Sequence, residues 1–357
     1  MVHRRQASAV AVLVAVVFSA GLAAQKRDDK KQDEGQRREL AAVQKLADDL
    51  SAGSAAPNDL GLAWLHEDFI KAQSNKEYVP FMIVVDPSKV PGGRLTLYWR
   101  VVSKDATAAP PPGRNDKNDK NDKKDKDKAA KPEYAWEDVG YDVSLPLTAA
   151  GATGPVRIAR AFSVPAGTYD VYIAAKEPAS TAKNAPAKTA VVRQTVTVPD
   201  FWNGELNTSS VIIAQRMDPL PAPLTPQQQT DRPYALGLFE LALQLEMKFS
   251  KKAELQPVFF VYNPQLDSDG KPDVVIEYNF YSKSGGAEKF FNHTSPQNYN
   301  ATTLPQFKAA EGHQVPGGLA IPLTSFPEGD YRLEIKVTDN ISKKTVTRDV
   351  NFAVAAS

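Results

Sequence analysis

Residues 326–354 read FPEGDYRLEIKVTDNISKKTVTRDVNFAV, and the fold can be worked out from this stretch. Over residues 331–338 apolar side chains alternate with polar ones, a period of two that predicts a strand with one buried face. A second run of β-branched and apolar residues follows a polar turn, so the two runs predict a hairpin. Gly329, two positions before Tyr331, is typical of a tyrosine corner, in which the phenol binds backbone upstream.

An altered copy of this stretch occurs earlier in the chain. Residues 164–169, VPAGTY, repeat its Pro, Gly and Tyr at the same spacing, and residues 188–198 parallel residues 344–354. Further segments match in the same order, namely 80–87 with 257–264, 95–104 with 274–283, and Leu60-Gly61-Leu62 with Leu236-Gly237-Leu238. Matches in one order are hard to obtain by chance and indicate a tandem duplication. The predicted fold class is all-β, with two tandem immunoglobulin-like β-sandwiches and a short N-terminal helix.

The remaining segments place the domain boundaries. The predicted divisions are a signal peptide (1–24), a charged disordered segment with a short helix (25–59), a first immunoglobulin-like domain (60–198) with a disordered Lys/Asp/Asn-rich insertion (106–132), a linker with one strand (199–235) and a second domain (236–357). The helix is expected over residues 39–50, because Leu40, Val43, Leu46 and Leu50 form an apolar stripe, and it is expected to pack on the first sandwich.

Two segments and the linker carry separate expectations. Residues 60–73 fit either a strand or a helix. Residues 239–249 alternate without a break, which predicts one strand. The apolar run after Ser209 predicts a strand that adds to the sheet of the second domain, which would make the linker short and bring the two sandwiches into contact.

Charge and cysteine content exclude several classes of function. The chain has 43 basic and 42 acidic residues among 357, so no global field attracts nucleic acid or an anionic membrane. It has no cysteine, which removes disulfides, thiolate catalysis and Cys-type zinc sites. Arg4 and Arg5, an apolar run over 9–18 and small residues up to Ala24 predict a secretory signal peptide, with an uncleaved anchor as the alternative. The expected location is periplasmic or secreted, with no membrane span after cleavage.

Catalytic motifs are missing from the sequence. The four histidines are scattered, and His66-Glu67 is not followed by a second histidine at the spacing of a zinc site. No GxSxG elbow, Walker-type loop or dinucleotide fingerprint occurs. We therefore expect a protein that is not an enzyme and has no cofactor.

The sharpest local motif is a turn with three carboxylates. Asp267, Asp269 and Asp273 surround Gly270, and carboxylates at alternate positions can converge on Ca²⁺. Asp-Gly is also a common hairpin turn, Pro272 restricts the loop, and the usual terminal Glu is missing. The turn is thus either a plain hairpin turn or a calcium site.

Aromatic residues form the other candidate site. Phe290, Phe291, Tyr299 and Phe307 lie in a polar stretch, residues 282–318, that has no counterpart in the first domain. Such rings could stack on sugars or hold a peptide. The alternative is that they close the end of the sandwich core, because burial is the usual fate of large rings.

The corner motif and the Asp-Gly-Lys-Pro-Asp turn together resemble a known group. The second repeat is similar to immunoglobulin-like modules of exported, largely uncharacterised bacterial proteins, some of which also carry von Willebrand A-type or Gly-Trp-x-Thr-Asp domains. This chain has neither the Gly-Trp-x-Thr-Asp nor the Asp-x-Ser-x-Ser motif, so neither function carries over. The resemblance implies a fold and an exported location.

These observations predict a non-enzymatic exported binding or structural protein. Its partner would be a protein or a cell-envelope polymer, and not nucleic acid. The alternative is a metal-dependent carbohydrate-binding module or carbohydrate-active enzyme that uses the Asp267 turn and the aromatic loop. Clustering of those side chains in one concave pocket would favour the alternative.

Overall fold

The computed structural model describes residues 34–104, 134–145, 154–178 and 186–355. The predicted signal peptide (1–24) and the predicted insertion (106–132) lie outside these ranges. Strands dominate the described residues, and the predicted all-β sandwich fold with a short N-terminal helix is confirmed. Within the same ranges, no helix is long and apolar enough to cross a membrane.

The first sandwich consists of two sheets. Its strands are β1 (Ala63–Glu67), β2 (Ile70–Lys71), β3 (Glu77–Val85), β4 (Arg94–Ser103), β5 (Trp136–Ser144), β6 (Val156–Val164), β7 (Gly167–Lys176) and β8 (Thr189–Val198). One sheet has β3 at its centre, with β1 and β2 on one side and β6 on the other. The other sheet has the order β5-β4-β7-β8, antiparallel throughout. Trp99, Phe81, Phe162 and Val171 are among the buried residues between the two sheets.

The second sandwich repeats this plan with additions. Its strands are β9 (Asn207–Thr208), β10 (Ile212–Pro219), β11 (Ala235–Leu236), β12 (Phe239–Leu243), β13 (Lys248–Ser250), β14 (Glu254–Tyr262), β15 (Val274–Ser284), β16 (Ala287–His293), β17 (Gln297–Tyr299), β18 (Val315–Gly318), β19 (Ile321–Pro322), β20 (Gly329–Asp339) and β21 (Thr345–Ala355). One sheet has the order β11-β12-β10-β14-β18, and the other has the order β13-β21-β20-β15-β16. As predicted, the strand after Ser209, β10, pairs with β14 of the second domain.

Both tyrosine corners predicted from the repeat are present. The hydroxyl of Tyr331 donates to the carbonyl of Pro327 at 2.8 Å, and that of Tyr169 donates to the carbonyl of Pro165 at 2.9 Å. Gly329 and Gly167 lie between these partners at φ 146° and 153°, a conformation that side-chain-bearing residues rarely adopt. The same backbone turn, which requires Pro-x-Gly-x-Tyr spacing, therefore occurs once in each sandwich.

Removing the corner hydroxyl is expected to cost stability. Tyr331→Phe keeps the buried ring but leaves the Pro327 carbonyl without its donor, so we expect a loss of about 1–2 kcal/mol in the free energy of unfolding. Urea unfolding measures this loss. Tyr281→Phe, on the outward side of the neighbouring strand β15, is the matched control and should change stability by less than about 0.5 kcal/mol. Equal effects of the two substitutions would contradict the corner interaction.

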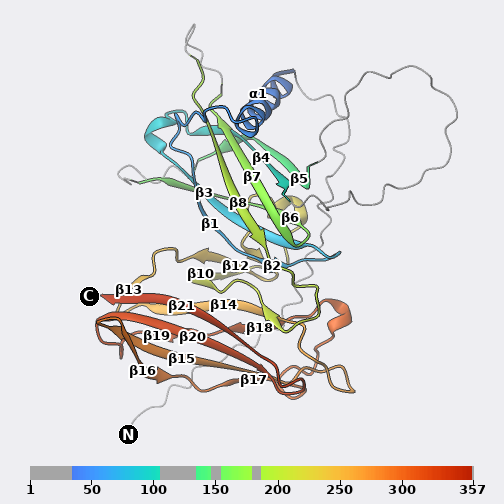
Figure 1. Cartoon of the computed structure of the whole chain (residues 1–357), viewed down its shortest axis with the longest axis vertical. Coiled ribbons are helices and arrows are strands. Elements are labelled where there is room, and N and C mark those ends of the chain that lie inside the picture. The colour runs from blue at the N-terminus through green and yellow to red at the C-terminus, as the bar shows by residue number, and fades with distance from the viewer. Residues whose placement is uncertain (1–33, 105–133, 146–153, 179–185, 356–357) are drawn as a thin grey trace, which may run out of the picture.

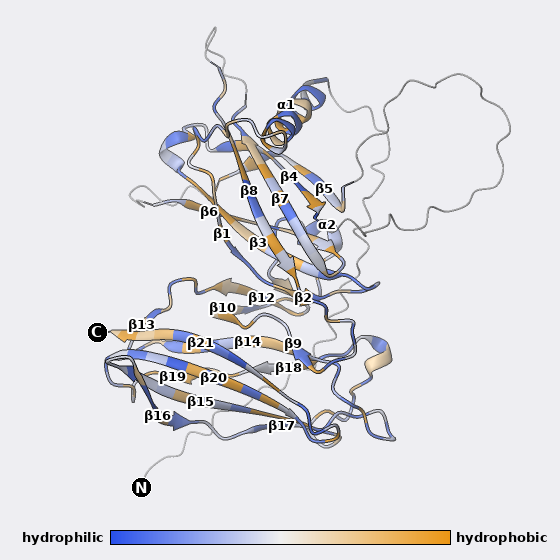
Figure 2. Ribbon diagram, in the orientation of Figure 1, coloured by the Kyte–Doolittle hydropathy of each residue, from blue (hydrophilic) through white to orange (hydrophobic). Residues whose placement is uncertain are grey.

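The sheets stack in layers (Figure 1). Helix α1 (Glu34–Ser51) lies on the outer face of β4, β7 and β8, and the two sheets of the first sandwich follow. The two sheets of the second sandwich come next. The sheet that contains β3 in the first sandwich therefore faces the sheet that contains β10 and β14 in the second sandwich. A short helix, α2 (Pro226–Gln229), and 3-10 turns at Pro87–Lys89 and Ala309–Glu311 occupy the connections. Figure 2 shows hydrophobic residues along the strands of both sandwiches.

The N-terminal helix agrees with the sequence prediction and begins earlier than expected. Val43 and Ala47 are fully buried against Tyr98, Tyr172 and Val191 of the sheet below. Lys176 donates to both oxygens of Glu39 at 2.7 Å, and Arg100 pairs with Asp48. The predicted apolar stripe thus packs on the first sandwich, and ion pairs flank it.

Three local expectations are corrected or decided. Residues 60–73, which fitted either a strand or a helix, form the strands β1 and β2. The single strand predicted over residues 239–249 is wrong, because the chain crosses between sheets after Leu243: β12 pairs with β10, whereas β13 pairs in parallel with β21. Leu60-Gly61-Leu62 and Leu236-Gly237-Leu238 match in sequence but occupy different places in their sandwiches. The first leads into β1, which pairs with β3, and the second lies in the β11–β12 hairpin.

Candidate interaction surfaces

The Asp267 turn is held by its own backbone. Oδ1 of Asp267 accepts from the main-chain N–H groups of Asp269 at 2.9 Å and Lys271 at 2.8 Å. Asp273 accepts from the side chain of Asn340 at 3.0 Å. The ammonium of Lys271 donates to the carbonyls of Pro305 and Phe307 at 2.7 and 2.9 Å, so a cation already occupies the oxygens beside the turn. No three His, Cys, Asp or Glu side chains in the described ranges come close enough together to hold a metal ion.

We expect calcium to leave the stability of this protein unchanged. An ion bound only by the folded state adds about 2.7 kcal/mol at a hundredfold over its dissociation constant, which a melting curve resolves. Oδ1 of Asp267 accepts hydrogen bonds from the backbone, and in the described part of the chain no group of three acidic or histidine side chains could hold an ion. Melting midpoints in EDTA and in millimolar Ca²⁺ should therefore coincide. An upward shift in Ca²⁺ that Asp269→Ala removes would contradict this expectation.

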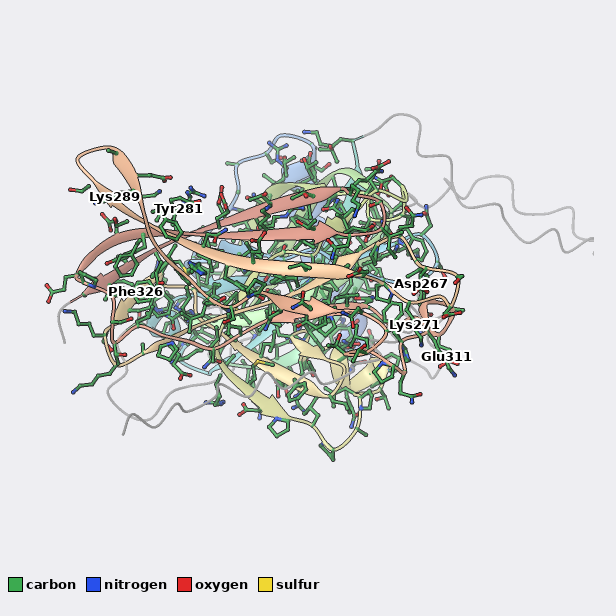
Figure 3. The ribbon with its side chains drawn as sticks, turned by 90° about the horizontal axis from the view of Figure 1, so that it is seen from below. Asp267, Lys271, Tyr281, Lys289, Glu311 and Phe326 are labelled. Atoms are coloured by element: carbon green, nitrogen blue, oxygen red, sulfur yellow. The ribbon has the colours of Figure 1, made fainter. Side chains whose placement is uncertain are left out.

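The four predicted aromatic residues do not form one site. Tyr299 and Phe307 are buried in the core of the second sandwich. Phe291 packs on that core, with its ring centroid 5.0 Å from Phe326 and 5.4 Å from Tyr331. Only Phe290 of the four is exposed, at 52%. Figure 3 shows Tyr281 and Lys289, which neighbour Phe290, at one end of the second sandwich and Asp267 with Lys271 at the other. The turn and the exposed ring are therefore separated.

Phe290 belongs to a polar surface on the outer sheet, which we call the Arg332 face. It consists of the outward residues Glu277, Tyr281, Glu288, Phe290, Arg332, Glu334, Lys336 and Asp349. The guanidinium of Arg332 lies 4.3 Å from the ring centroid of Tyr281, and the Tyr281 ring meets Phe290 edge-on at 5.9 Å.

Arg332 organises the charges of this face. It contacts Glu288 at 2.9 Å, Asp349 at 2.6 Å and Glu334 at 3.3 Å, and these hydrogen bonds raise its pKa further above its usual range. The hydrogen bonds from Arg332 also hold the pKa of the Glu288 carboxyl below its usual value. The charged side chains of the Arg332 face are thus paired with one another and partly exposed to solvent, and Phe290 is the one exposed apolar side chain among the residues that define this face.

The equivalent face of the first sandwich is different. Three and five positions after the corner tyrosine, the first repeat has Tyr172 and Ala174, whereas the second has Glu334 and Lys336. Tyr172 and Ala174 are buried under helix α1. Glu334 and Lys336 lie on β20, and the main contacts of β20 with described elements are those with β15 and β21 of its own sheet. Figure 1 shows no helix over this sheet. Of the two outer sheet faces, the Arg332 face is therefore the one left uncovered by the described chain.

The two sandwiches share an apolar joint. The joint cluster consists of Ile70, Ala72, Tyr78, Phe201, Ile212, Ala214, Tyr234, Leu236, Leu241, Leu243, Phe260 and Tyr262. In the first sandwich these residues come from β2, from Ala72 just after it, and from β3. Phe201 and Tyr234 belong to the connection, and the others come from β10, β11, β12 and β14 of the second sandwich. All are 8% exposed or less, as in the cores of the sandwiches themselves. The linker is thus part of a packed contact, as the sequence predicted.

Direct hydrogen bonds cross the joint. The main-chain N–H of Phe69 donates to Oγ of Ser210 at 2.9 Å, and the N–H of Ser210 donates to the carbonyl of Phe69 at 3.0 Å. The hydroxyl of Tyr234 donates to Asp68 at 3.0 Å, and His66 lies 2.8 Å from the same oxygen. Burial alone would lower the pKa of His66, but the hydrogen bond and charge of Asp68 outweigh burial and hold that pKa above its usual value.

A second polar group in the joint surrounds Glu77. Glu77 is fully buried, and its Oε1 accepts from the N–H of Phe201 at 3.0 Å. Its other oxygen, Oε2, has no hydrogen-bond partner among the described residues. Burial is the main reason that the pKa of Glu77 rises to about 7. Nearby, Lys71 contacts the exposed ring of Trp202 and the side chain of Asn263.

Sequence reasoning predicted contact between the sandwiches but did not identify the residues of the joint, Glu77 or the Arg332 face. One signal for the joint is present: β3 reads EYVPFMIVV, with apolar side chains at neighbouring positions where a half-buried strand would alternate. Such a run indicates a strand covered on both faces. Nothing in the sequence around Glu77 or Arg332 distinguishes them from surface residues. Phe201, which donates to Glu77, and Glu288 and Asp349, which pair with Arg332, come from distant segments.

The geometry defines a tandem β-sandwich protein with a packed interdomain joint. A scan against protein-family models finds no match, and neither does a search of curated proteins. Among solved structures, dimeric latent PorU from Porphyromonas gingivalis is 10% identical, with 87% of this chain and 21% of PorU covered at a TM-score of 0.31. The α2-macroglobulin of E. coli is 12% identical, with 85% of this chain and 16% of that chain covered at a TM-score of 0.21. Similarity at these TM-scores carries no argument about function.

Proposed function

We propose that this chain is an exported, non-enzymatic binding or structural protein in which the two immunoglobulin-like sandwiches act as one body. The observation that carries the proposal is the joint cluster, which buries one sheet face of each sandwich against the other. Helix α1 covers a third sheet face. The Arg332 face then remains as the sheet surface on which a partner can be held.

The chemistry of the Arg332 face supports binding to a macromolecule. Aromatic residues and arginine are enriched at the centres of protein interfaces. Phe290 lies on β16, whose outer edge pairs with no other strand in the part of the chain that the structure describes. A partner would be a protein or a cell-envelope polymer, and export through the predicted signal peptide would bring the chain to it.

Co-sedimentation tests this proposal. We expect the chain from Gln25 onward to pellet with washed bacterial cell envelopes. Phe290→Asp should reduce the bound fraction at least about tenfold, since a central aromatic contact is worth about 1.4 kcal/mol or more. Leu65→Asp is the matched control, because Leu65 is an exposed apolar residue of similar exposure on the first sandwich. Equal binding of wild type and Phe290→Asp would overturn the proposed surface.

A further inference from the structure

Lys71 and Glu77 face each other in the joint but do not pair. They are directly opposite in the β2–β3 register. The ammonium of Lys71 instead donates to Oδ1 of Asn263 at 2.8 Å and lies 4.3 Å from the ring centroid of Trp202. Within the described ranges, no ion pair joins Lys71 to Glu77, although an acid opposite a lysine is the usual partner across two strands.

The choice of partner has a structural consequence. Asn263 belongs to the second sandwich and Trp202 to the connection between the two, whereas Glu77 belongs to the first. In its present position Lys71 therefore ties the first sandwich to the second. Paired with Glu77, it would tie two strands of the first sandwich to each other and leave Asn263 without this donor.

The charge on Glu77 decides between these arrangements. A neutral carboxyl needs no counterion, and this leaves Lys71 free to contact Asn263 and Trp202. An ionised carboxylate in a fully buried position needs a cation, because an unpaired buried charge is costly. Lys71, directly opposite on the adjacent strand, is the cation whose charge already acts on Glu77.

We propose that Lys71 is a latch between the two sandwiches and that the protonation of Glu77 sets its partner. With Glu77 neutral, Lys71 bridges to Asn263 and Trp202 and the joint is closed at this corner. With Glu77 ionised, Lys71 turns to Glu77 and the corner loosens.

The groups around Glu77 define the pH range of the exchange. The charged or titratable groups around Glu77 are Lys71 on β2, Asp200 in the connection and Tyr262 on β14. On β6, the residue paired with Glu77 is the apolar Val164. Burial raises the pKa of Glu77 to about 7, with the charge of Asp200 adding to this and the charge of Lys71 opposing it. The latch therefore exchanges partners near neutral pH, closed below and open above.

Trp202 reports on the latch directly. Its ring centroid lies 4.3 Å from the Lys71 ammonium, closer than that of Tyr262 at 6.0 Å. The difference in fluorescence between the wild-type chain and Trp202→Phe isolates Trp202 from the other tryptophans. Between pH 5 and 9 we expect this difference signal to titrate with a midpoint near 7. Glu77→Gln should abolish the titration, and Asp200→Asn should shift its midpoint to lower pH.

Two controls separate the latch from other groups. His66→Gln should leave the titration in place, which excludes the histidine at the Asp68 end of the joint. Lys71→Met should give a flat signal in a folded protein, because the moving charge is absent. A titration that persists in Glu77→Gln, or a flat signal in the wild-type chain, would overturn the proposal.

The effect on the joint is measured by distance. The chain has no cysteine, so spin labels attached through Thr197→Cys on the first sandwich and Lys289→Cys on the second are the sole labels. We expect the distribution of distances between them to be broader at pH 8.5 than at pH 5.5, and to be the same at both pH values in Glu77→Gln. An unchanged distribution in the otherwise wild-type chain would overturn control of the joint by the latch.

Discussion

Ala214→Asp is expected to split the unfolding of this protein into two transitions. Ala214 is 1% exposed and lies in the joint cluster on β10, where it faces the first sandwich. A carboxyl placed there has to be buried without a partner, at a cost of about 3 kcal/mol or more. The buried carboxyl weakens the contact between the two sandwiches and leaves the core inside each sandwich unchanged.

Differential scanning calorimetry checks this expectation. In the wild-type chain we expect one cooperative transition, because the joint is buried as completely as the two cores. In Ala214→Asp the sandwiches should unfold separately, the less stable one first. Thr347→Asp is the matched control on the exposed side of β21 and should retain the single transition. Two separate transitions in the wild-type chain would contradict the view that both sandwiches act as one body.

Asp339→Asn is expected to destabilise the second sandwich by about 3 kcal/mol. Asp339 is fully buried at the end of β20. Its Oδ2 accepts from the N–H of Gln265 at 2.8 Å and from the hydroxyl of Ser342 at 2.6 Å, and its Oδ1 accepts from the N–H groups of Ile341 and Ser342. Asparagine has one acceptor oxygen, so in either orientation its NH₂ group meets an N–H donor and leaves buried hydrogen bonds unmade.

The pH dependence of this variant follows from the same contacts. Burial alone would raise the pKa of Asp339, but the hydrogen bonds from Ser342, Gln265 and Ile341 outweigh burial and lower it. An acid whose pKa is lower in the folded state stabilises the fold above its unfolded pKa, about 4, and this stabilisation is lost as the pH falls through the folded value. Urea unfolding should therefore show a large difference between wild type and Asp339→Asn at pH 7 that shrinks towards pH 3. A difference that is the same at both pH values would contradict the role of the charge.

Local patterns predicted the elements of this protein well. The tyrosine corners of both repeats were predicted because Pro, Gly and Tyr at fixed spacing are the requirement of one turn. Helix α1 was predicted because an apolar stripe at a helical period needs a surface to cover. The crossing between β12 and β13 was missed, because residues 239–249 alternate in the same way whichever sheet receives them.

The candidate sites were predicted less well, for a related reason. Asp267, Asp269 and Asp273 are close in sequence, and their proximity indicated a shared site, but Asp267 serves the backbone and Asp273 pairs with Asn340. Phe290 and Phe291 are neighbours in sequence, yet one ring is exposed and the other packs on the core. Sequence neighbours on a strand point to opposite faces, so closeness along the chain does not define a surface.

The sequence by itself predicted most of the strands, the two tyrosine corners and the amphipathic helix, because each of these depends on side-chain period or on backbone conformation within a few residues. The tertiary structure alone decided which faces meet. Along the sequence, most of the first sandwich lies between Lys71 or Glu77 and the residues Trp202 and Asn263. The contacts of Lys71 with Trp202 and Asn263, and of Glu77 with Phe201, exist only because the joint brings β2, β3 and β14 together. Burial without an ion pair is what raises the pKa of Glu77, and burial is a property of the packed layers and not of the residue.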